Sequence, residues 1–305
     1  MEPVYLARRA AQSRFFEVRG LRLHAHVWGD ASLVTPERPA LLLMHGWMDV
    51  GASYQFVVDA LAADRYVIAA DWRGFGRSEA PQPTDGYSFA DYLGDLDGLV
   101  DAISPEAPID LVGHSMGGNI VMLYAGVRPQ RVRRLVNLEG FGLPQMAPEM
   151  APKRYAQWLD ELKTPQALRD YASADEVAQR LRKNNPRLSA DKATWLAPHW
   201  ARLDVASGRW QIQGDPAHKR TNPVLYRVEE ILACWRRIEC PLLWIEGEAT
   251  DIGKWWGERY TKSEFDARLA VVPQVERHAL ADCGHMLHHD QPQRVAALVE
   301  AFLDR

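Results

Sequence analysis

The stretch Gly113-His114-Ser115-Met116-Gly117-Gly118 decides the fold, because it joins a short apolar run to a helical one. Residues 109–112 before it are apolar, as in a covered strand, and residues 119–125 after it have helical character. A serine at a sharp strand-to-helix turn adopts a strained backbone, and glycines on either side leave room for the neighbouring chain. The stretch therefore predicts a serine hydroxyl that projects where a substrate can reach it.

Short apolar runs recur outside this turn and predict a sheet. They lie at residues 40–44, 66–70, 109–112, 135–138 and 241–245. Such runs are typical of strands covered on both faces, which indicates a mostly parallel sheet. Helical periodicity at residues 89–103 and 295–302 lies between or after them, and this alternation indicates an α/β fold. Residues 15–28 alternate around Gly20 and predict an antiparallel hairpin.

The strand–helix rhythm breaks from about Pro144 to Trp235. This part is polar, interrupted by prolines and helical in character, so we expect an insertion that stands over one end of the sheet. It contains five tryptophans, and because ligand clefts are mostly aromatic and aliphatic, we expect some of these rings to face the serine. They are Trp158, Trp195, Trp200, Trp210 and Trp235.

A serine nucleophile needs a base, and His285 is the best candidate among ten histidines. It follows the strand-like residues 277–280 and precedes the last amphipathic helix, so we expect it on a loop at the end of the sheet. Its neighbours His288 and His289 have the character of surface residues.

Two carboxylates compete to orient the histidine. Asp251 follows the apolar run 241–245, and the usual order of serine, acid and histidine along the chain favours it. Glu139 follows the run 135–138 and is the alternative acid, or otherwise a polar residue of the pocket.

Acyl transfer places negative charge on the carbonyl oxygen, so two aimed N–H donors are required. We expect the amides of Met116 and of Trp47, in His45-Gly46-Trp47-Met48, to form this oxyanion hole. We expect His45 to brace the loop. His45, Gly46, Trp47 and Phe141 are also the predicted substrate-binding residues.

Composition limits the partners. Among 305 residues, 36 Lys and Arg stand against 40 Asp and Glu, which gives a net charge of -4 and no basic footprint for nucleic acid or an anionic membrane. The odd count of three cysteines and the lack of an apolar leader run favour the cytoplasm over secretion. We expect a small apolar or moderately polar substrate, and a homodimer is left open.

Four stretches resemble the α/β-hydrolase family in order and spacing. They are LLLMHGWMD, the run from 71 to 81 (DWRGFGRSEAP), LVGHSMGG and GHMLHHDQP. The resemblance implies an eight-stranded, mostly parallel sheet with helices on both faces. It also implies a core of residues 1–143 and 236–305, with a helical cap of residues 144–235 between strands six and seven.

For the site, the resemblance implies a triad of Ser115, Asp251 and His285 with an oxyanion hole at Trp47 and Met116. Asp251 lies one residue later after Gly247 than in the commonest pattern, and LEGFGLP around Glu139 is similar to the segment that supplies a glutamate acid in some haloalkane dehalogenases. Those enzymes and epoxide hydrolases need a carboxylate nucleophile, so a serine at this position argues against both activities.

We therefore expect a cofactor-independent serine hydrolase of carboxylic esters, a carboxylesterase. Carbon–carbon bond hydrolysis, lactone opening and peroxide-dependent acyl transfer use the same groups and remain alternatives, as does a non-catalytic ligand-binding homologue. His24, His26 and Asp30 faintly suggest a metal site, but their spacing favours a solvated hairpin face. We expect neither a metal nor a cofactor.

Overall fold

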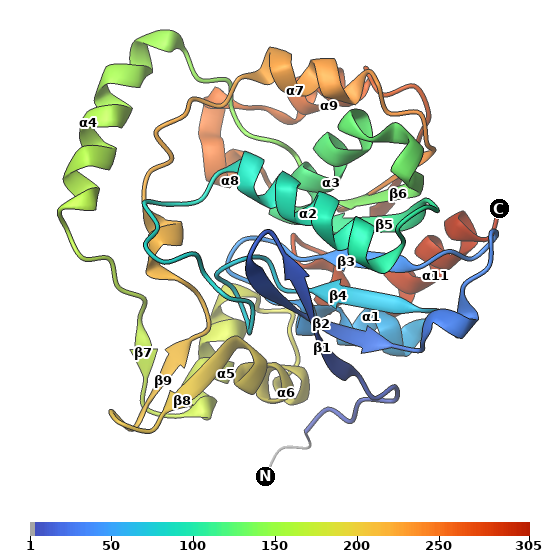
Figure 1. The fold of residues 1–305 in the computed structure, drawn as a ribbon, viewed down its shortest axis with the longest axis horizontal. Coiled ribbons are helices and arrows are strands. Elements are labelled where there is room, and N and C mark those ends of the chain that lie inside the picture. The colour runs from blue at the N-terminus through green and yellow to red at the C-terminus, as the bar shows by residue number, and fades with distance from the viewer. Residues whose placement is uncertain (1–3) are drawn as a thin grey trace.

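The computed structural model describes residues 4–305 and contains an eight-stranded central sheet (Figure 1). The strands follow the order β1-β2-β4-β3-β5-β6-β10-β11 across it. Their bounds are β1 Gln12–Val18, β2 Leu21–Trp28, β3 Leu41–Met44, β4 Val67–Ala70, β5 Ile109–His114, β6 Val132–Leu138, β10 Leu242–Gly247 and β11 Val275–Leu280. β2 runs antiparallel to β1 and β4, and every other pair is parallel. The predicted mostly parallel α/β sheet is confirmed.

Helices cover both faces of the sheet. Those of the core are α1 Gln55–Ala60, α2 Phe89–Ile103, α3 Met116–Val127, α8 Gly253–Trp256, α9 Lys262–Leu269, α10 Leu287–Asp290 and α11 Pro292–Leu303. Side chains of a strand alternate between the faces, so Leu42 and Met44 of β3 pack with α2 and α3, whereas Leu41 and Leu43 pack with α1 and α11. None of the helices in residues 4–305 combines the length and the apolar character needed to cross a membrane.

The insertion between β6 and β10 contains a small sheet as well as helices. Its elements are α4 Ala151–Leu162, β7 Asp170–Tyr171, α5 Ala174–Asn184, α6 Ala190–Trp200, β8 Ala201–Asp204, β9 Arg209–Ile212 and α7 Val228–Trp235. β9 pairs antiparallel with both β7 and β8 (Figure 1). The prediction of a purely helical insertion is therefore wrong. These strands are two to four residues long and partly exposed, so they carry no continuous apolar run.

The last helix of the predicted insertion lies on the core. Val228, Leu232 and Trp235 of α7 are buried in the same cluster as α2 and α3. A Cβ atom on Gly126 of α3 would lie only 2.0 Å from the carbonyl oxygen of Cys234 in α7, so the two helices touch backbone to backbone. The predicted end of the insertion, residue 235, therefore lies too late in the sequence. The part of the insertion that stands over one end of the sheet ends before α7, and α7 itself packs on the core.

Candidate active site

Ser115 stands at a strained turn between β5 and α3. Its backbone has φ 52° and ψ −114°, a conformation that a residue with a side chain rarely adopts. A Cβ atom on Gly113 would lie 2.5 Å from the carbonyl carbon of Gly117, and one on Gly117 would lie 2.3 Å from the carbonyl oxygen of Met44. Only glycine fits at these two positions, and the turn places the Ser115 hydroxyl at the carboxyl end of β5.

A chain of hydrogen bonds joins Ser115, His285 and Glu139. Nε2 of His285 lies 2.9 Å from Oγ of Ser115, and Nδ1 lies 2.7 Å from Oε2 of Glu139. Glu139 directly follows β6 with a positive φ of 58°, and it is 1% exposed. Its other oxygen, Oε1, accepts a hydrogen bond of 2.6 Å from the backbone N–H of Gly247. The carboxylate is therefore fixed on both sides, which holds the ring with Nε2 free to accept the serine proton.

The preference for Asp251 as the acid is wrong for this geometry. Asp251 is exposed, and its Oδ1 accepts a hydrogen bond of 2.9 Å from the N–H of Gly253 at the start of α8. Within residues 4–305 no hydrogen bond or ion pair joins Asp251 to His285. The loop after β10 turns this carboxylate outward, whereas the positive φ of Glu139 lets the earlier carboxylate reach the ring from the neighbouring strand.

Three further contacts hold the loop that carries His285. Nε2–H of the buried His114 donates to the carbonyl oxygen of His285 at 2.8 Å, and burial lowers the pKa of His114 well below its usual range, so the ring stays neutral. Oδ2 of Asp290 accepts from the N–H of Gly284 at 2.9 Å. The ring of Trp255 packs edge-on to that of His285, with 4.6 Å between centroids. Sequence reasoning missed His114, although it directly precedes the serine.

The loop of residues 45–48, where one donor of the oxyanion hole is predicted, lies against Ser115. A Cβ atom on Gly46 would lie 3.2 Å from Cβ of Ser115, so the backbone of this loop touches the serine. Within residues 4–305 the backbone N–H groups of Trp47 and Met116 donate to no other residue. Met116 is the first residue of α3, where an N–H has no partner inside the helix. Two free donors therefore flank the serine.

Two predicted substrate contacts lie elsewhere. His45 is fully buried. Its Nδ1–H donates to the carbonyl of Gly46 at 2.7 Å and its Nε2 accepts from the N–H of Trp72 at 3.0 Å, so it braces the loop as expected but does not line the cleft. Burial lowers the pKa of His45, in keeping with this neutral form. Phe141 is 3% exposed and packs against Trp244 and Phe265 in the core, so it is corrected to a core residue.

A cleft of about 640 Å³ opens above Ser115 between the core and the insertion. The core contributes Gly46, Trp47, Met48, Ser115, Trp255 and His285, among others. The apolar residues of the insertion that line it are Leu168, Tyr171, Leu181, Leu188, Trp200 and Ile212. Some of the five tryptophans of the insertion were expected to face the serine, and of these five only Trp200 lines the cleft. The volume suits a small organic molecule.

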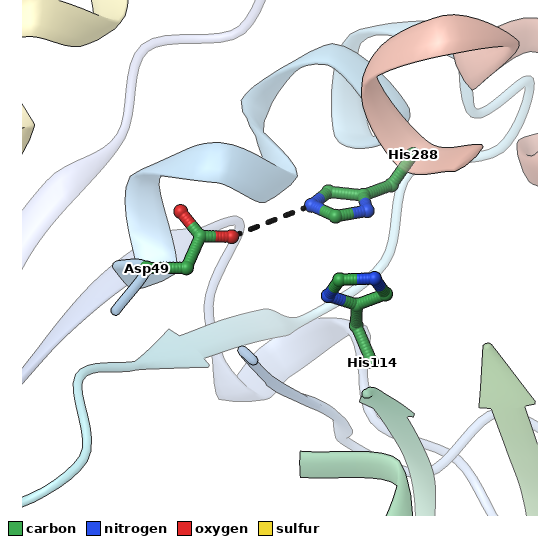
Figure 2. A group of neighbouring side chains, drawn as sticks. All are labelled: Asp49, His114 and His288. Carbon is green, nitrogen blue, oxygen red and sulfur yellow. Dashed lines mark ion pairs between the residues drawn. The ribbon is translucent and has the colours of Figure 1, made fainter. Parts of the chain in front are cut away.

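Behind the serine lies a buried group of Asp49, His114 and His288, whose ligand atoms are within 4.8 Å of one another (Figure 2). One carboxylate and two imidazoles suit a divalent transition ion. Two of the three side chains pair, since Nε2 of His288 lies 3.5 Å from Oδ2 of Asp49, and Ser53 donates to the same carboxylate. Burial opposes ionisation, but the hydrogen bond from His288 and the surrounding histidines keep the pKa of Asp49 below its usual range. Within residues 4–305, Nδ1 of His114 has no hydrogen-bond partner, so the contact between His288 and Asp49 accounts for only two of the three side chains.

The other histidine predictions need correction. His288 and His289, expected at the surface, are 0% and 3% exposed because α10 turns them inward. His24 is also fully buried. Its Nδ1 lies 2.7 Å from Oδ2 of Asp71 and its Nε2 lies 2.9 Å from Oγ of Ser13, so this hairpin face is not solvated at His24.

Comparison with known proteins decides the family. The sequence profile of the family described as alpha/beta hydrolase fold matches residues 39–292, which is most of the chain. The chain belongs to the α/β-hydrolase family. The predicted resemblance and fold are thereby confirmed.

Some relatives of this α/β hydrolase are similar over most of their length. A 3-hydroxybutyrate-oligomer hydrolase of Cupriavidus necator is 28% identical over 293 residues, which cover 92% of each chain. A serine hydrolase-like protein of Danio rerio is 24% identical over 306 residues, which cover 97% of this chain and 89% of that one. Among solved structures, a thioesterase domain from the curacin biosynthetic pathway superposes with a TM-score of 0.78 at 27% identity, over 95% of this chain and 99% of that domain.

Proposed function

We propose that this α/β hydrolase cleaves carboxylic esters through an acyl-enzyme on Ser115. The observation that carries the proposal is the hydrogen-bonded chain from Ser115 through His285 to Glu139 at the base of the cleft. A serine becomes a nucleophile only when a base takes its proton, and an imidazole serves as that base when a carboxylate holds its tautomer and stabilises its charged form.

In the proposed reaction, Oγ of Ser115 attacks the acyl carbon while Nε2 of His285 takes the hydroxyl proton. Glu139 stabilises the imidazolium through Nδ1. The negative charge on the former carbonyl oxygen is met by the free N–H groups of Trp47 and Met116. The imidazolium then protonates the leaving alcohol. Water, activated by the same histidine, attacks the acyl-enzyme, and the acid leaves with Ser115 restored.

The chemistry of the nucleophile and one relative both support an ester as substrate. Epoxide hydrolases and haloalkane dehalogenases form an alkyl-enzyme ester on a carboxylate, whereas this position holds a serine hydroxyl. The Cupriavidus necator relative is named for 3-hydroxybutyrate oligomers, whose units are joined by ester bonds. We also propose a reducing compartment such as the cytoplasm, because Cys234, Cys240 and Cys283 are all unpaired.

Turnover of p-nitrophenyl acetate and butyrate, compared with a Ser115→Ala variant, tests the proposal. We expect the wild type to release p-nitrophenol with saturation kinetics and the variant to fall to the rate of the uncatalysed reaction. A wild type no faster than Ser115→Ala on these esters would overturn it. Parallel assays with a lactone, a β-diketone and hydrogen peroxide as acyl acceptor identify the alternative reactions of the same groups.

A further inference from the structure

Three positively charged side chains line the wall of the cleft that the insertion forms. Arg169 lies directly before β7, Arg180 lies on α5 and Lys219 ends a short 3-10 helix, Pro216–Lys219. All three belong to the insertion, and all three line the cleft that contains Ser115 and His285. The protein as a whole carries a net charge of -4, so this local excess of positive charge does not reflect its composition.

None of the three cations is neutralised by another residue of the described range, 4–305. Over residues 4–305, no carboxylate lies within 4.0 Å of Arg169, Arg180 or Lys219 in an ion pair. Lys219 donates to the neutral carbonyl of Ala167 at 2.9 Å, and the Arg169 guanidinium lies 5.1 Å from the centre of the Tyr171 ring. Among residues 4–305, Asp49 is the one acidic residue that lines the cleft, and it is buried and paired with His288. Arg180 is half-buried, and a partly desolvated guanidinium favours an anionic partner.

We propose that these residues form a subsite for a carboxylate on the substrate, with Arg180 as its principal contact. This inference rests on the proposed esterase function and names its substrate class. The guanidinium fork matches a carboxylate with two parallel hydrogen bonds, and Arg169 and Lys219 add to the positive field. Tyr171, Leu181 and Trp200 line the same cleft and suit a short apolar segment. The substrate is thus an ester with a short apolar chain and a free carboxylate.

The test compares two ligands that differ in this charge and by one methyl group, the linear dimer of 3-hydroxybutyrate and its methyl ester. Calorimetric titration of Ser115→Ala measures binding without turnover, so the subsite is tested even where no ester is cleaved. We expect the free acid to bind about tenfold more tightly than the methyl ester, as for a hydrogen-bonded charge pair. Adding Arg180→Gln should abolish most of this difference, and higher salt should reduce it.

Arg182→Gln is the matched control, because Arg182 lies two residues further on α5, is exposed and does not line the cleft. It should keep the preference for the free acid. Two results would overturn the proposed subsite. One is equal affinity of Ser115→Ala for the two ligands. The other is a preference for the free acid that persists when Arg169→Gln, Arg180→Gln and Lys219→Gln are combined. A different result separates the two proposals. If the enzyme with Ser115 intact cleaves neither ligand, but the Ser115→Ala variant still binds the free acid preferentially, the esterase function is overturned and the subsite is supported.

Discussion

Oε2 of Glu139 lies 2.7 Å from Nδ1 of His285, so the carboxylate that orients the histidine comes from the end of β6 and not from the end of β10. The second carboxylate oxygen is held by the N–H of Gly247, the last residue of β10. The acid of one strand is thus anchored to the next strand in the sheet, which leaves the loop after β10 free to turn outward with Asp251.

Glu139→Gln should lower kcat for ester hydrolysis by about 10³- to 10⁴-fold with little change in KM, because an amide cannot stabilise the imidazolium or hold its tautomer. Steady-state kinetics on p-nitrophenyl butyrate measure this loss. Asp251→Asn is the control, and it should stay within about twofold of wild type, since Asp251 is exposed and its carboxylate accepts a hydrogen bond from Gly253 in its own turn. A larger loss in Asp251→Asn than in Glu139→Gln would contradict the assignment.

Trp47→Phe should leave kcat within about threefold of wild type, because the expected oxyanion donor is the backbone N–H of residue 47, which the substitution keeps. The exposed indole should affect mainly KM through the wall of the cleft. A fall in kcat of about 10²- to 10³-fold would mean that the indole N–H is itself a donor to the oxyanion.

Gly117→Ala should destabilise the fold by about 3 kcal/mol, because the new Cβ atom would lie 2.3 Å from the carbonyl oxygen of Met44 and backbone cannot give way as a side chain can. Urea unfolding measures the change. At Gly214 the nearest atom is a side-chain carbon of Leu168 at 3.3 Å, so Gly214→Ala should cost less than about 1 kcal/mol. Similar costs at the two positions would show that the turn does not need glycine.

The free energy of unfolding should fall as the pH drops from 7 to 5. Burial lowers the pKa of His26 and of His218 to about 4, from an ordinary value of 6.5. Between these values the unfolded chain binds protons that the folded protein does not, so acid favours unfolding by about 2 kcal/mol for each of the two histidines at pH 5. The loss is complete below pH 4.

Urea unfolding at several pH values checks this prediction. His218→Gln should weaken the dependence, because a glutamine takes up no proton. A free energy of unfolding that stays constant from pH 7 to 5 would contradict the account.

The sequence predicted the parts of the site that depend on local pattern. Ser115 and His285 were found because each follows a recognisable strand and lies in a turn with its own signature. The acid could not be chosen this way, because Asp251 and Glu139 both follow a strand. The positive φ of Glu139 and the outward turn of the loop that carries Asp251 appear only in the fold. Likewise, the sequence predicts a surface position for His288, because its partner Asp49 lies far away in the sequence and only the fold brings the two together. The strands of the insertion were missed because they are short and partly exposed.

The central claim is that Ser115 is an activated nucleophile, and labelling with a fluorophosphonate followed by peptide mass spectrometry tests it most directly. We predict one covalent adduct per chain on Ser115, no adduct in Ser115→Ala, and labelling slowed by orders of magnitude in His285→Ala. An unlabelled wild-type protein that is folded, or a wild-type adduct on a residue other than Ser115, would contradict the claim.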